Sequence, residues 1–225
     1  MTIDVSYLAI SDKRCTVQFA GCNFRCRGCF SKERQKGGKT MRGKELAAYI
    51  PPDKEVMLAG GEPTINREGL LELIDELEQD RVILSTNGYL LDAELIDQIK
   101  NVTVHIDLKA LNPELHRWYT GMDNRNVLEA IRLLYEKGLD FEVSTVYIPG
   151  IVDAPEIEAI ARFLASVGDI ALKIMRYVPV GDLSRRPLDS EIEEAMKRGA
   201  KYLDNVSSSI ENRSHPSGER IIIVP

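Results

Sequence analysis

The sequence lacks any long apolar run. No segment of the 225 residues approaches the roughly 18 consecutive apolar residues that a membrane-spanning helix needs. The opening stretch, MTIDVSYLAISDKR, has no basic segment followed by an apolar one, as a secretory signal would. Low-complexity tracts are also missing, and a chain that is 44% hydrophobic and 28% charged has the composition of a folded protein. These features predict a folded, cytoplasmic protein without a membrane anchor.

A large excess of either charge is also absent. The chain has 29 Lys and Arg against 35 Asp and Glu, which gives a net charge of −6. A protein with this balance is not expected to coat nucleic acid or an anionic membrane surface, because both attract strongly basic proteins. We therefore expect neither nucleic acid nor a membrane among its partners.

Cysteine is scarce, and all of it lies in one stretch. The four residues are Cys15, Cys22, Cys26 and Cys29. Disulfides of a secreted protein would be spread along the chain, so this crowding predicts reduced thiols that hold a metal or a cluster. Cys15 falls inside an apolar, strand-like segment, where a small buried side chain is expected rather than a ligand.

Short β-type apolar runs alternate with amphipathic helical patterns along most of the chain. This order predicts a parallel sheet with right-handed crossovers, either an open doubly wound sheet or a barrel. Six units are too few to close an eight-stranded barrel, so we expect an α/β fold with a partial (β/α)6 barrel. The expected strands are residues 15–19, 55–59, 81–85, 102–108, 141–148 and 172–178.

The chain is expected to form one domain. Its core would cover about residues 14–180, and an extension over residues 181–225 would add a helix near 190–198 and a strand at 221–224. Among local signals, Asp153 and Glu156 resemble a capping box, and Gly138 is placed where a helix would end in a left-handed residue.

The three histidines are not expected to be ligands. His105 lies within a predicted strand and is expected to be an interior residue with its hydrogen bonds satisfied. His116 and His215 lie in polar stretches and are expected to be exposed to solvent.

Polar segments follow four of the predicted strands. In both candidate geometries the carboxyl ends of parallel strands meet at one edge, so these segments are expected to converge there. The sequence therefore predicts a functional site at this rim. The segments are residues 22–29, 60–63, 85–88 and 107–109.

The spacing of three cysteines defines the chemistry that this rim could hold. Cys22, Cys26 and Cys29 are separated by three and two residues. A cubane [4Fe–4S] cluster needs four ligands, so three thiolates would leave one iron open to another ligand. A four-thiolate zinc site that includes Cys15 is the competing interpretation, although structural zinc more often uses two separated pairs. The spacing favours the cluster.

Together these motifs resemble the radical S-adenosylmethionine (SAM) superfamily. The C-x3-C-x2-C loop after the first strand and GGEP at residues 60–63 carry this resemblance. STNG at 85–88, DLK at 107–109 and YIPG at 147–150 are similar to the activating enzymes of glycyl radical enzymes, of the pyruvate formate-lyase or anaerobic ribonucleotide reductase type. The resemblance covers roughly residues 14–180.

The resemblance implies a reaction. A [4Fe–4S] cluster would sit on Cys22, Cys26 and Cys29, and the amine and carboxylate of SAM would chelate the fourth iron. An electron from a donor such as ferredoxin or flavodoxin would cleave SAM, and the resulting 5′-deoxyadenosyl radical would abstract hydrogen from a substrate. We expect that substrate to be a glycyl radical enzyme. The alternatives are an enzyme for a small molecule or nucleic acid, similar to 7-carboxy-7-deazaguanine synthase, and a zinc-stabilised interaction domain.

The resemblance also implies which residues bind SAM. Gly60 and Gly61 would let the backbone approach the methionyl amine, and Glu62 would add a carboxylate for the same cation. Lys109 suits the methionyl carboxylate or the ribose. The full set of expected contacts is Gly60, Gly61, Glu62, Ser85, Thr86, Asn87, Asp107, Lys109 and Phe30.

Two positions, Phe30 and Ser85, differ from the related enzymes, and two further residues are expected at the site. Phe30 follows the last cysteine, whereas many superfamily members carry an aromatic just before it, and its ring is expected near adenine. Formate-lyase activases place an acid at the position of Ser85 to bind a monovalent cation, so such a cation would here depend on Asp107. Arg176 and Tyr177, at the end of the sixth strand, are expected to make deeper contacts.

Overall fold

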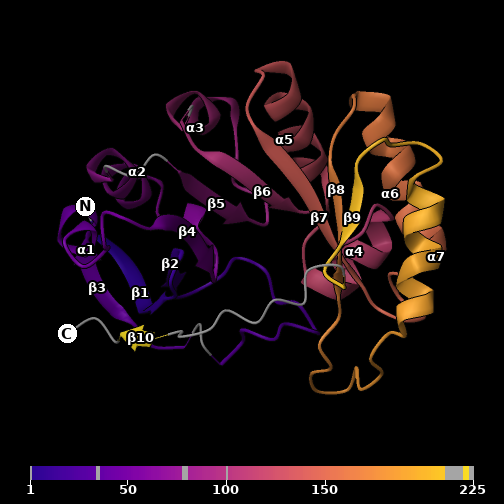
Figure 1. Cartoon of the computed structure of the whole chain (residues 1–225), viewed down its shortest axis with the longest axis horizontal. Coiled ribbons are helices and arrows are strands. Elements are labelled where there is room, and N and C mark those ends of the chain that lie inside the picture. The colour runs from indigo at the N-terminus through magenta and orange to yellow at the C-terminus, as the bar shows by residue number, and fades with distance from the viewer. Residues whose placement is uncertain (1, 34–35, 78–80, 100, 211–219, 223–225) are drawn as a thin grey trace.

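One continuous sheet positions every loop of the predicted rim. The computed structural model describes residues 2–33, 36–77, 81–99, 101–210 and 220–222. The sheet has ten strands in the order β10-β1-β2-β4-β5-β6-β7-β8-β9, with β3 paired to β1 (Figure 1). The strands are β1 (Thr2–Ile10), β2 (Arg14–Phe19), β3 (Lys39–Arg42), β4 (Glu55–Gly60), β5 (Val82–Thr86), β6 (Thr103–Asp107), β7 (Phe141–Tyr147), β8 (Leu172–Arg176), β9 (Val206–Ser208) and β10 (Arg220–Ile222).

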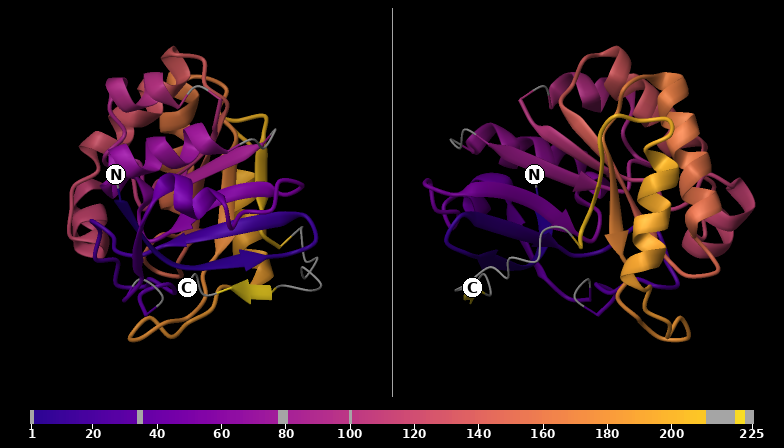
Figure 2. Two further views of the ribbon diagram at one scale, coloured as in Figure 1. Left: turned by 90° about the vertical axis from the view of Figure 1, so that its left-hand side faces the viewer. Right: turned by 45° about the vertical axis from the view of Figure 1, so that its right-hand side comes forward.

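Helices connect the parallel strands. Figures 1 and 2 show α2, α3, α5, α6 and α7 as an arc on one side of the sheet. Within the described ranges, no helix is both long enough and apolar enough to span a membrane. The helices are α1 (Gly43–Ala47), α2 (Arg67–Glu76), α3 (Ala93–Gln98), α4 (Pro113–Thr120), α5 (Arg125–Glu136), α6 (Ala154–Val167) and α7 (Asp189–Gly199), with a short 3-10 helix η1 (Pro63–Ile65).

The predicted parallel order is confirmed from β2 to β8. These strands pair in parallel with their neighbours, and β9 continues the parallel array. The sheet stays open, as a partial barrel requires. The predicted helix near residues 190–198 is α7. That the whole chain forms a single domain stays a prediction.

The sequence interpretation missed β1 and β3. β1 pairs antiparallel with β2 on one side and with β3 and β10 on the other, so it extends the sheet beyond the first parallel strand. Its first residues alternate between exposed and buried, with Ile3 and Val5 in the core, which is the usual signal of a half-buried strand. The expected last strand is seen as β10, and residues 223–225 lie outside the described residues.

The two faces of the parallel sheet differ in burial. On β6 and β7, Val104, Ile106 and Val143 are completely buried in the core that the helices cover. The alternate residues His105 and Glu142 are only partly buried, with 3.3 Å between His105 Nδ1 and the Glu142 carboxylate. Burial lowers the pKa of His105, which favours the neutral ring. His105 therefore has a polar partner, as expected, but it lies on the face that the helices leave open and not in the interior.

One of the two local helix signals was wrong. Gly138 has the expected positive φ, +67°, just after α5. Asp153 precedes α6 but its side chain makes no capping hydrogen bond. Glu156 instead accepts hydrogen bonds from the backbone amides of Leu111 (2.6 Å) and Asn112 (2.8 Å). A contact distant in sequence has therefore replaced the local one.

Glu156 is expected to stabilise the fold through these two amides. Replacing it by Ala leaves both N–H groups without their acceptor, so the free energy of unfolding should fall by about 1–3 kcal/mol. Urea denaturation measures this loss. Glu193→Ala, an exposed change on α7, is the control and should alter the stability by less than about 0.5 kcal/mol. Equal effects of the two substitutions would contradict the assigned role.

Candidate functional site

The rim predicted from the sequence exists in the structure. The strands β2, β4, β5 and β6 are consecutive neighbours in the sheet and run parallel, so their carboxyl ends lie along one edge. Side-chain contacts join the loops that follow them. Asn87, after β5, donates from Nδ2 to Asn23 Oδ1 (2.7 Å) in the cysteine loop, and its backbone N–H donates to Glu62 (2.7 Å), after β4.

The three loop cysteines are partly buried thiols that face this rim. The backbone N–H of Phe24 lies 3.4 Å from Cys22 Sγ, and Asn87 Nδ2 lies 3.8 Å from the same sulfur. Burial raises the pKa of Cys22, and the Phe24 amide opposes that shift. Burial also raises the pKa of Cys26 to about 12, against the nearby positive charge of Lys109. N–H donors and a cation are features that favour the thiolate form needed for metal binding.

Cys15 is separate from this group. It is fully buried in the core on β2, and burial raises its pKa to about 11. Over the described part of the chain, no three His, Cys, Asp or Glu side chains are close enough together to hold one metal ion. Cys15 lies on β2 in the core, whereas the other three thiols lie in the loop after that strand, so the zinc site that would include Cys15 gains no support. A cubane cluster binds each thiolate to a different iron and does not require such convergence.

Gly60, the last residue of β4, and Gly61 after it allow close packing against β2 and the cysteine loop. Gly61 N–H donates to Phe19 O (2.9 Å), and Glu62 N–H donates to Gly21 O (2.8 Å), so the backbone pairing of β2 and β4 continues beyond the strands. A Cβ atom at Gly61 would collide with the carbonyl of Gly21, and one at Gly60 with the side chain of Gln18. Gly60 also has a φ of +114°. Both glycines are therefore needed to seat the loop.

Glu62 is buried at the centre of the rim. Only 1% of it is exposed, and burial raises its pKa. Its carboxylate accepts from Thr64 N (3.0 Å), Thr64 Oγ1 (2.5 Å), Thr86 Oγ1 (2.6 Å) and Asn87 N (2.7 Å). It thus joins the loops after β4 and β5. Its expected contact with SAM stays a prediction, as does that of Thr86.

Lys109 and Asp107 form an ion pair after β6. The Lys109 ammonium lies 3.1 Å from Asp107, and its side chain is 17% exposed. Burial opposes the positive charge, but Asp107 and Cys26 outweigh it and raise the pKa of Lys109. Asp107 also accepts a short hydrogen bond from Ser144 Oγ on β7. Ser85 lies partly exposed on β5, beside His105 in the β5–β6 register.

The aromatic residues near Cys29 are of two kinds: Phe30 is exposed, whereas Tyr119 and Tyr177 are buried. The Phe30 side chain is exposed (66%), and its contact with adenine stays a prediction. A Cβ atom at Gly28 would lie 2.9 Å from both Tyr119 Oη and Tyr177 Cε2, so these two buried rings fill the space behind the loop. The sequence interpretation missed Tyr119. Arg176 forms an ion pair with Asp189 of α7.

The carboxyl end of α4 holds the other side of the cysteine loop. The backbone amides of Arg25 and Arg27 donate to Thr120 O (2.7 Å) and Tyr119 O (3.0 Å), which satisfies carbonyls left open at the end of a helix. The Arg27 Nε also donates to Trp118 O (3.0 Å). The loop is therefore fixed between α4 and the loop that follows β4.

The prediction that His116 is exposed was wrong. The residue is fully buried, its Nδ1 lies 2.8 Å from Met122 O, and its ring contacts Phe24 edge-on at 5.5 Å. Phe24 lies between Cys22 and Cys26, so His116 supports the cysteine loop from α4. Burial lowers the pKa of His116, which favours the neutral ring. His215 lies outside the described residues.

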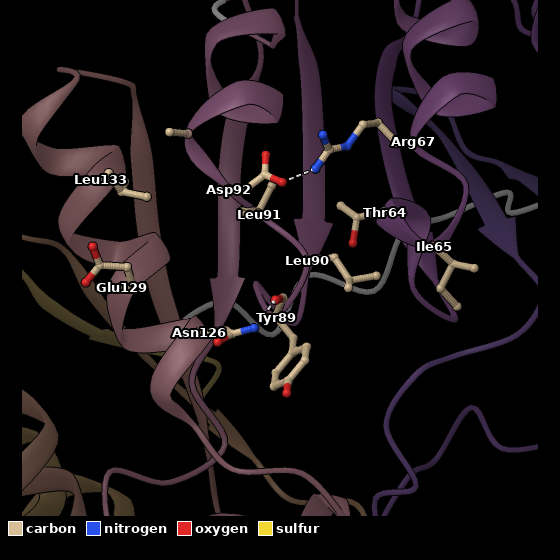
Figure 3. Close-up of a pocket in the computed structure, with 11 residues that line it drawn as sticks. Thr64, Ile65, Arg67, Tyr89, Leu90, Leu91, Asp92, Asn126, Glu129 and Leu133 are labelled. Atoms are coloured by element: carbon tan, nitrogen blue, oxygen red, sulfur yellow. Dashed lines mark hydrogen bonds and ion pairs between the residues drawn. The ribbon is translucent and has the colours of Figure 1, made fainter.

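A pocket of about 500 Å³ lies beside the rim, on the side covered by helices. Figure 3 shows it between α2, α3 and the start of α5, with the Arg67–Asp92 ion pair at one wall and Tyr89 near its mouth. None of the predicted site residues lines it. Two lining residues link it to the rim. Thr64 hydrogen-bonds to Glu62, while the backbone N–H of Tyr89 donates to Asn87 Oδ1 (3.0 Å) and its ring contacts Phe24 edge-on at 5.7 Å.

Comparison with known proteins defines the family. Residues 17–164 match the Radical SAM superfamily. The chain therefore belongs to this superfamily and is an enzyme of the radical SAM kind. The family implies SAM and a [4Fe–4S] cluster, and the thiols with their N–H donors fit such a cluster.

The similar proteins include activating enzymes. MJ1632 of Methanocaldococcus jannaschii, whose name assigns it provisionally to the glycyl-radical enzyme activating enzymes, is 35% identical over 97% of this chain and 89% of its own length. Pyruvate formate-lyase 1-activating enzyme of Escherichia coli strain K12 is 25% identical, covering 72% of this chain and 73% of that protein. These relatives confirm the resemblance drawn from the STNG, DLK and YIPG motifs.

Solved structures confirm the fold alone, since their sequences are distant. SAM-bound SuiB of Streptococcus suis aligns with a TM-score of 0.70 at 16% identity, over 86% of this chain and 51% of SuiB. A domain of pyruvate-formate lyase-activating enzyme from Bacteroides vulgatus gives a TM-score of 0.61 at 22% identity, over 69% of this chain and 98% of that domain.

Glu62→Gln tests the carboxylate bridge between the loops. In either orientation the amide NH2 group would face a backbone N–H, that of Asn87 or that of Thr64, so a donor would face a donor. The free energy of unfolding should therefore fall by about 1–3 kcal/mol. Chemical denaturation of the cluster-free protein measures the change. Glu136→Gln, exposed at the end of α5, is the matched control and should be nearly neutral. An unchanged stability of the Glu62 variant would show that the bridge contributes little.

His116→Ala tests the support that α4 gives to the cysteine loop. Loss of the ring removes its packing on Phe24, so the amides of Arg25 and Arg27 should exchange with solvent faster, by about tenfold or more. Hydrogen–deuterium exchange of peptides that cover residues 22–29 reports this directly. His105→Ala removes a histidine whose partner is Glu142 of β7 and not Phe24, and it should leave these peptides unchanged. Equal protection in both variants would exclude the supporting role.

Proposed function

We propose that this enzyme binds a [4Fe–4S] cluster through Cys22, Cys26 and Cys29 and cleaves SAM to activate a glycyl radical enzyme. The observation that supports the cluster most directly is the seating of the cysteine loop. Backbone hydrogen bonds fix it on both sides, and N–H donors approach Cys22 Sγ. A loop fixed in this way holds its thiols in place before any iron is bound, which favours assembly at this position.

The SAM site would lie next to these thiols along the rim. Lys109 would bind the methionyl carboxylate of a ligand held at the cluster, because its positive charge acts on both Cys22 and Cys26 and its ammonium is held by Asp107 at the end of β6. Asp107 keeps Lys109 charged and oriented. Gly60, Gly61 and Asn87 would contribute backbone and amide groups. Ser85 and Phe30 belong to the same proposal, with Phe30 on the exposed side.

The cluster, held by Cys22, Cys26 and Cys29 and reduced by an external electron donor, would supply the one-electron chemistry that cleaves SAM and allows hydrogen abstraction from a substrate. The residues of this chain would hold the cluster and SAM in place and exclude water from around them. Buried Glu62 holds the loops after β4 and β5 together, while Tyr119 and Tyr177 fill the space behind Gly28 and exclude water there.

A protein substrate agrees with the open sheet and with the names of the relatives. The helices cover one face of the sheet, and polar side chains such as Glu142 and Ser144 line the other without being fully buried. A glycine-bearing loop of a large partner could enter from that face. A monovalent cation beside Asp107 and a cytoplasmic location remain predictions from the sequence. The zinc-stabilised interaction domain does not agree with the family.

Anaerobic reconstitution tests the cluster and its ligands. Ala at Cys22, Cys26 or Cys29 should abolish the cluster, because a cubane with only two protein thiolates is poorly held, whereas Cys15→Ala should retain it. Iron and sulfide content together with the visible absorption spectrum measure this. The reduced wild type should convert SAM to 5′-deoxyadenosine and methionine, as chromatography would show. A full cluster in Cys26→Ala would contradict the ligand assignment.

The substrate is tested by incubating reduced enzyme and SAM with glycyl radical enzymes from the same cell. A glycyl doublet in the electron paramagnetic resonance spectrum would support the proposal. Absence of the doublet with every partner, together with deuterium transfer from a labelled small molecule into 5′-deoxyadenosine, would support the small-molecule alternative instead.

A further inference from the structure

One buried side-chain amide close to the rim has no partner for its N–H groups. Gln18 lies near the end of β2 and is only 6% exposed. Tyr7 Oη on β1 donates to Gln18 Oε1 at 3.5 Å, the outer limit of a hydrogen bond. Among the described residues, none accepts a hydrogen bond from Gln18 Nε2. Buried polar groups are nearly always hydrogen-bonded in folded proteins, so this amide marks a position where a ligand can be bound.

Asn87, the other buried amide of the rim, shows the contrast. Its Nδ2 donates to Asn23 Oδ1 (2.7 Å), and its Oδ1 accepts from the backbone N–H of Tyr89 (3.0 Å). Both ends of the Asn87 amide are therefore used to hold the loops together. The Gln18 amide has no such structural task.

The strand register places Gln18 on the face of the sheet that the helices leave open. Val17, the preceding residue, is level with Leu58 of β4, and Leu58 is level with Leu84 of β5. These three side chains are completely buried, and their row continues into the core that the helices cover. Successive residues of a strand point to opposite faces, so Gln18 points away from that core. Its neighbour on β4 is Ala59, whose small side chain leaves room beside the amide.

The unpaired N–H groups lie against the groups assigned to SAM. A Cβ atom at Gly60 would collide with Gln18 Nε2, so the amide fills the space that a side chain would occupy there. Lys109, assigned to the methionyl carboxylate, follows β6, and β4 and β5 separate that strand from β2 (Figure 1). Gln18 therefore lies beside the SAM site on the side away from Lys109, where the second reactant would be placed.

We propose that Gln18 hydrogen-bonds to a peptide group next to the glycine that reacts in the protein substrate. This inference rests on the proposed function, in which a glycine-bearing loop enters from the open face. Glycine has no side chain, so the enzyme can recognise the reacting residue only through the peptide groups around it. A side-chain amide carries a donor and an acceptor, and it can pair with the C=O and the N–H of one peptide group. The single long contact to Tyr7 leaves the amide free to turn toward such a partner.

Gln18→Leu tests this role, because leucine has a similar size and neither donates nor accepts. The probe is the blocked, fluorescently labelled peptide Ala-Ser-Gly-Ser-Ala, bound to the full chain as isolated and again after reconstitution with SAM. The affinity for the peptide should fall by about tenfold, since one or two hydrogen bonds are lost. The Kd for SAM and the rate of SAM cleavage by dithionite without substrate should not change. Gln98→Leu, exposed at the end of α3, is the matched control and should match the wild type.

An ester analogue of the peptide separates hydrogen bonding from a general effect on structure. In this analogue an oxygen atom replaces the glycine N–H, which removes the donor and weakens the carbonyl acceptor of the same group. The ester should bind the wild type about tenfold more weakly than the peptide does. The ester and the peptide should bind equally to Gln18→Leu, because the partner of that group has already been removed.

Four results would overturn the proposal. The wild type does not bind the peptide in either form, or Gln18→Leu binds it as the wild type does. The ester loses the same affinity with both proteins, or SAM affinity falls together with peptide affinity, which would assign Gln18 to the SAM site. A wild type that cleaves no SAM would refute the proposed function, and the comparison of ester and peptide would still decide whether Gln18 pairs with a peptide group.

Discussion

The whole site depends on how one loop of the backbone is clamped. Residues 19–21 pair with Gly61 and Glu62 on one side, and the amides of Arg25 and Arg27 bind the carbonyls at the end of α4 on the other. Neither clamp uses a cysteine side chain. Main-chain hydrogen bonds therefore hold the loop in place, and its thiols remain available to bind a metal.

Burial around this loop also sets its electrostatics. A carboxylate, an ammonium and several thiols are taken out of water within one small region, and each is matched by specific partners. Glu62 has four donors, while Lys109 has Asp107 beside it. These partners allow polar groups to be buried at the edge of a sheet whose interior is otherwise apolar. They also tie the loops of the rim together while one face of the sheet stays open.

The side chains of the cysteine loop differ in exposure, since the three thiols are partly buried and Arg25 and Arg27 are exposed. The thiols turn toward Lys109 and Asp107, where SAM is proposed to bind. Arg25 and Arg27 turn outward and form a surface whose charge is opposite to that of the chain as a whole.

The sequence by itself determined the order of the six parallel strands from β2 through β4 to β8, the rim and the family, because these follow from local periodicity and from short motifs at strand ends. The C-x3-C-x2-C spacing, GGEP and DLK were all visible without a structure. Only the tertiary structure decided which partners the side chains take. Glu156 was expected to cap its own helix but accepts hydrogen bonds from amides 44 and 45 residues away. His116 was expected to be exposed but is buried against Phe24. Such contacts join segments that are distant in the chain, and no local pattern encodes them, since their energy comes from burial after the sheet has formed.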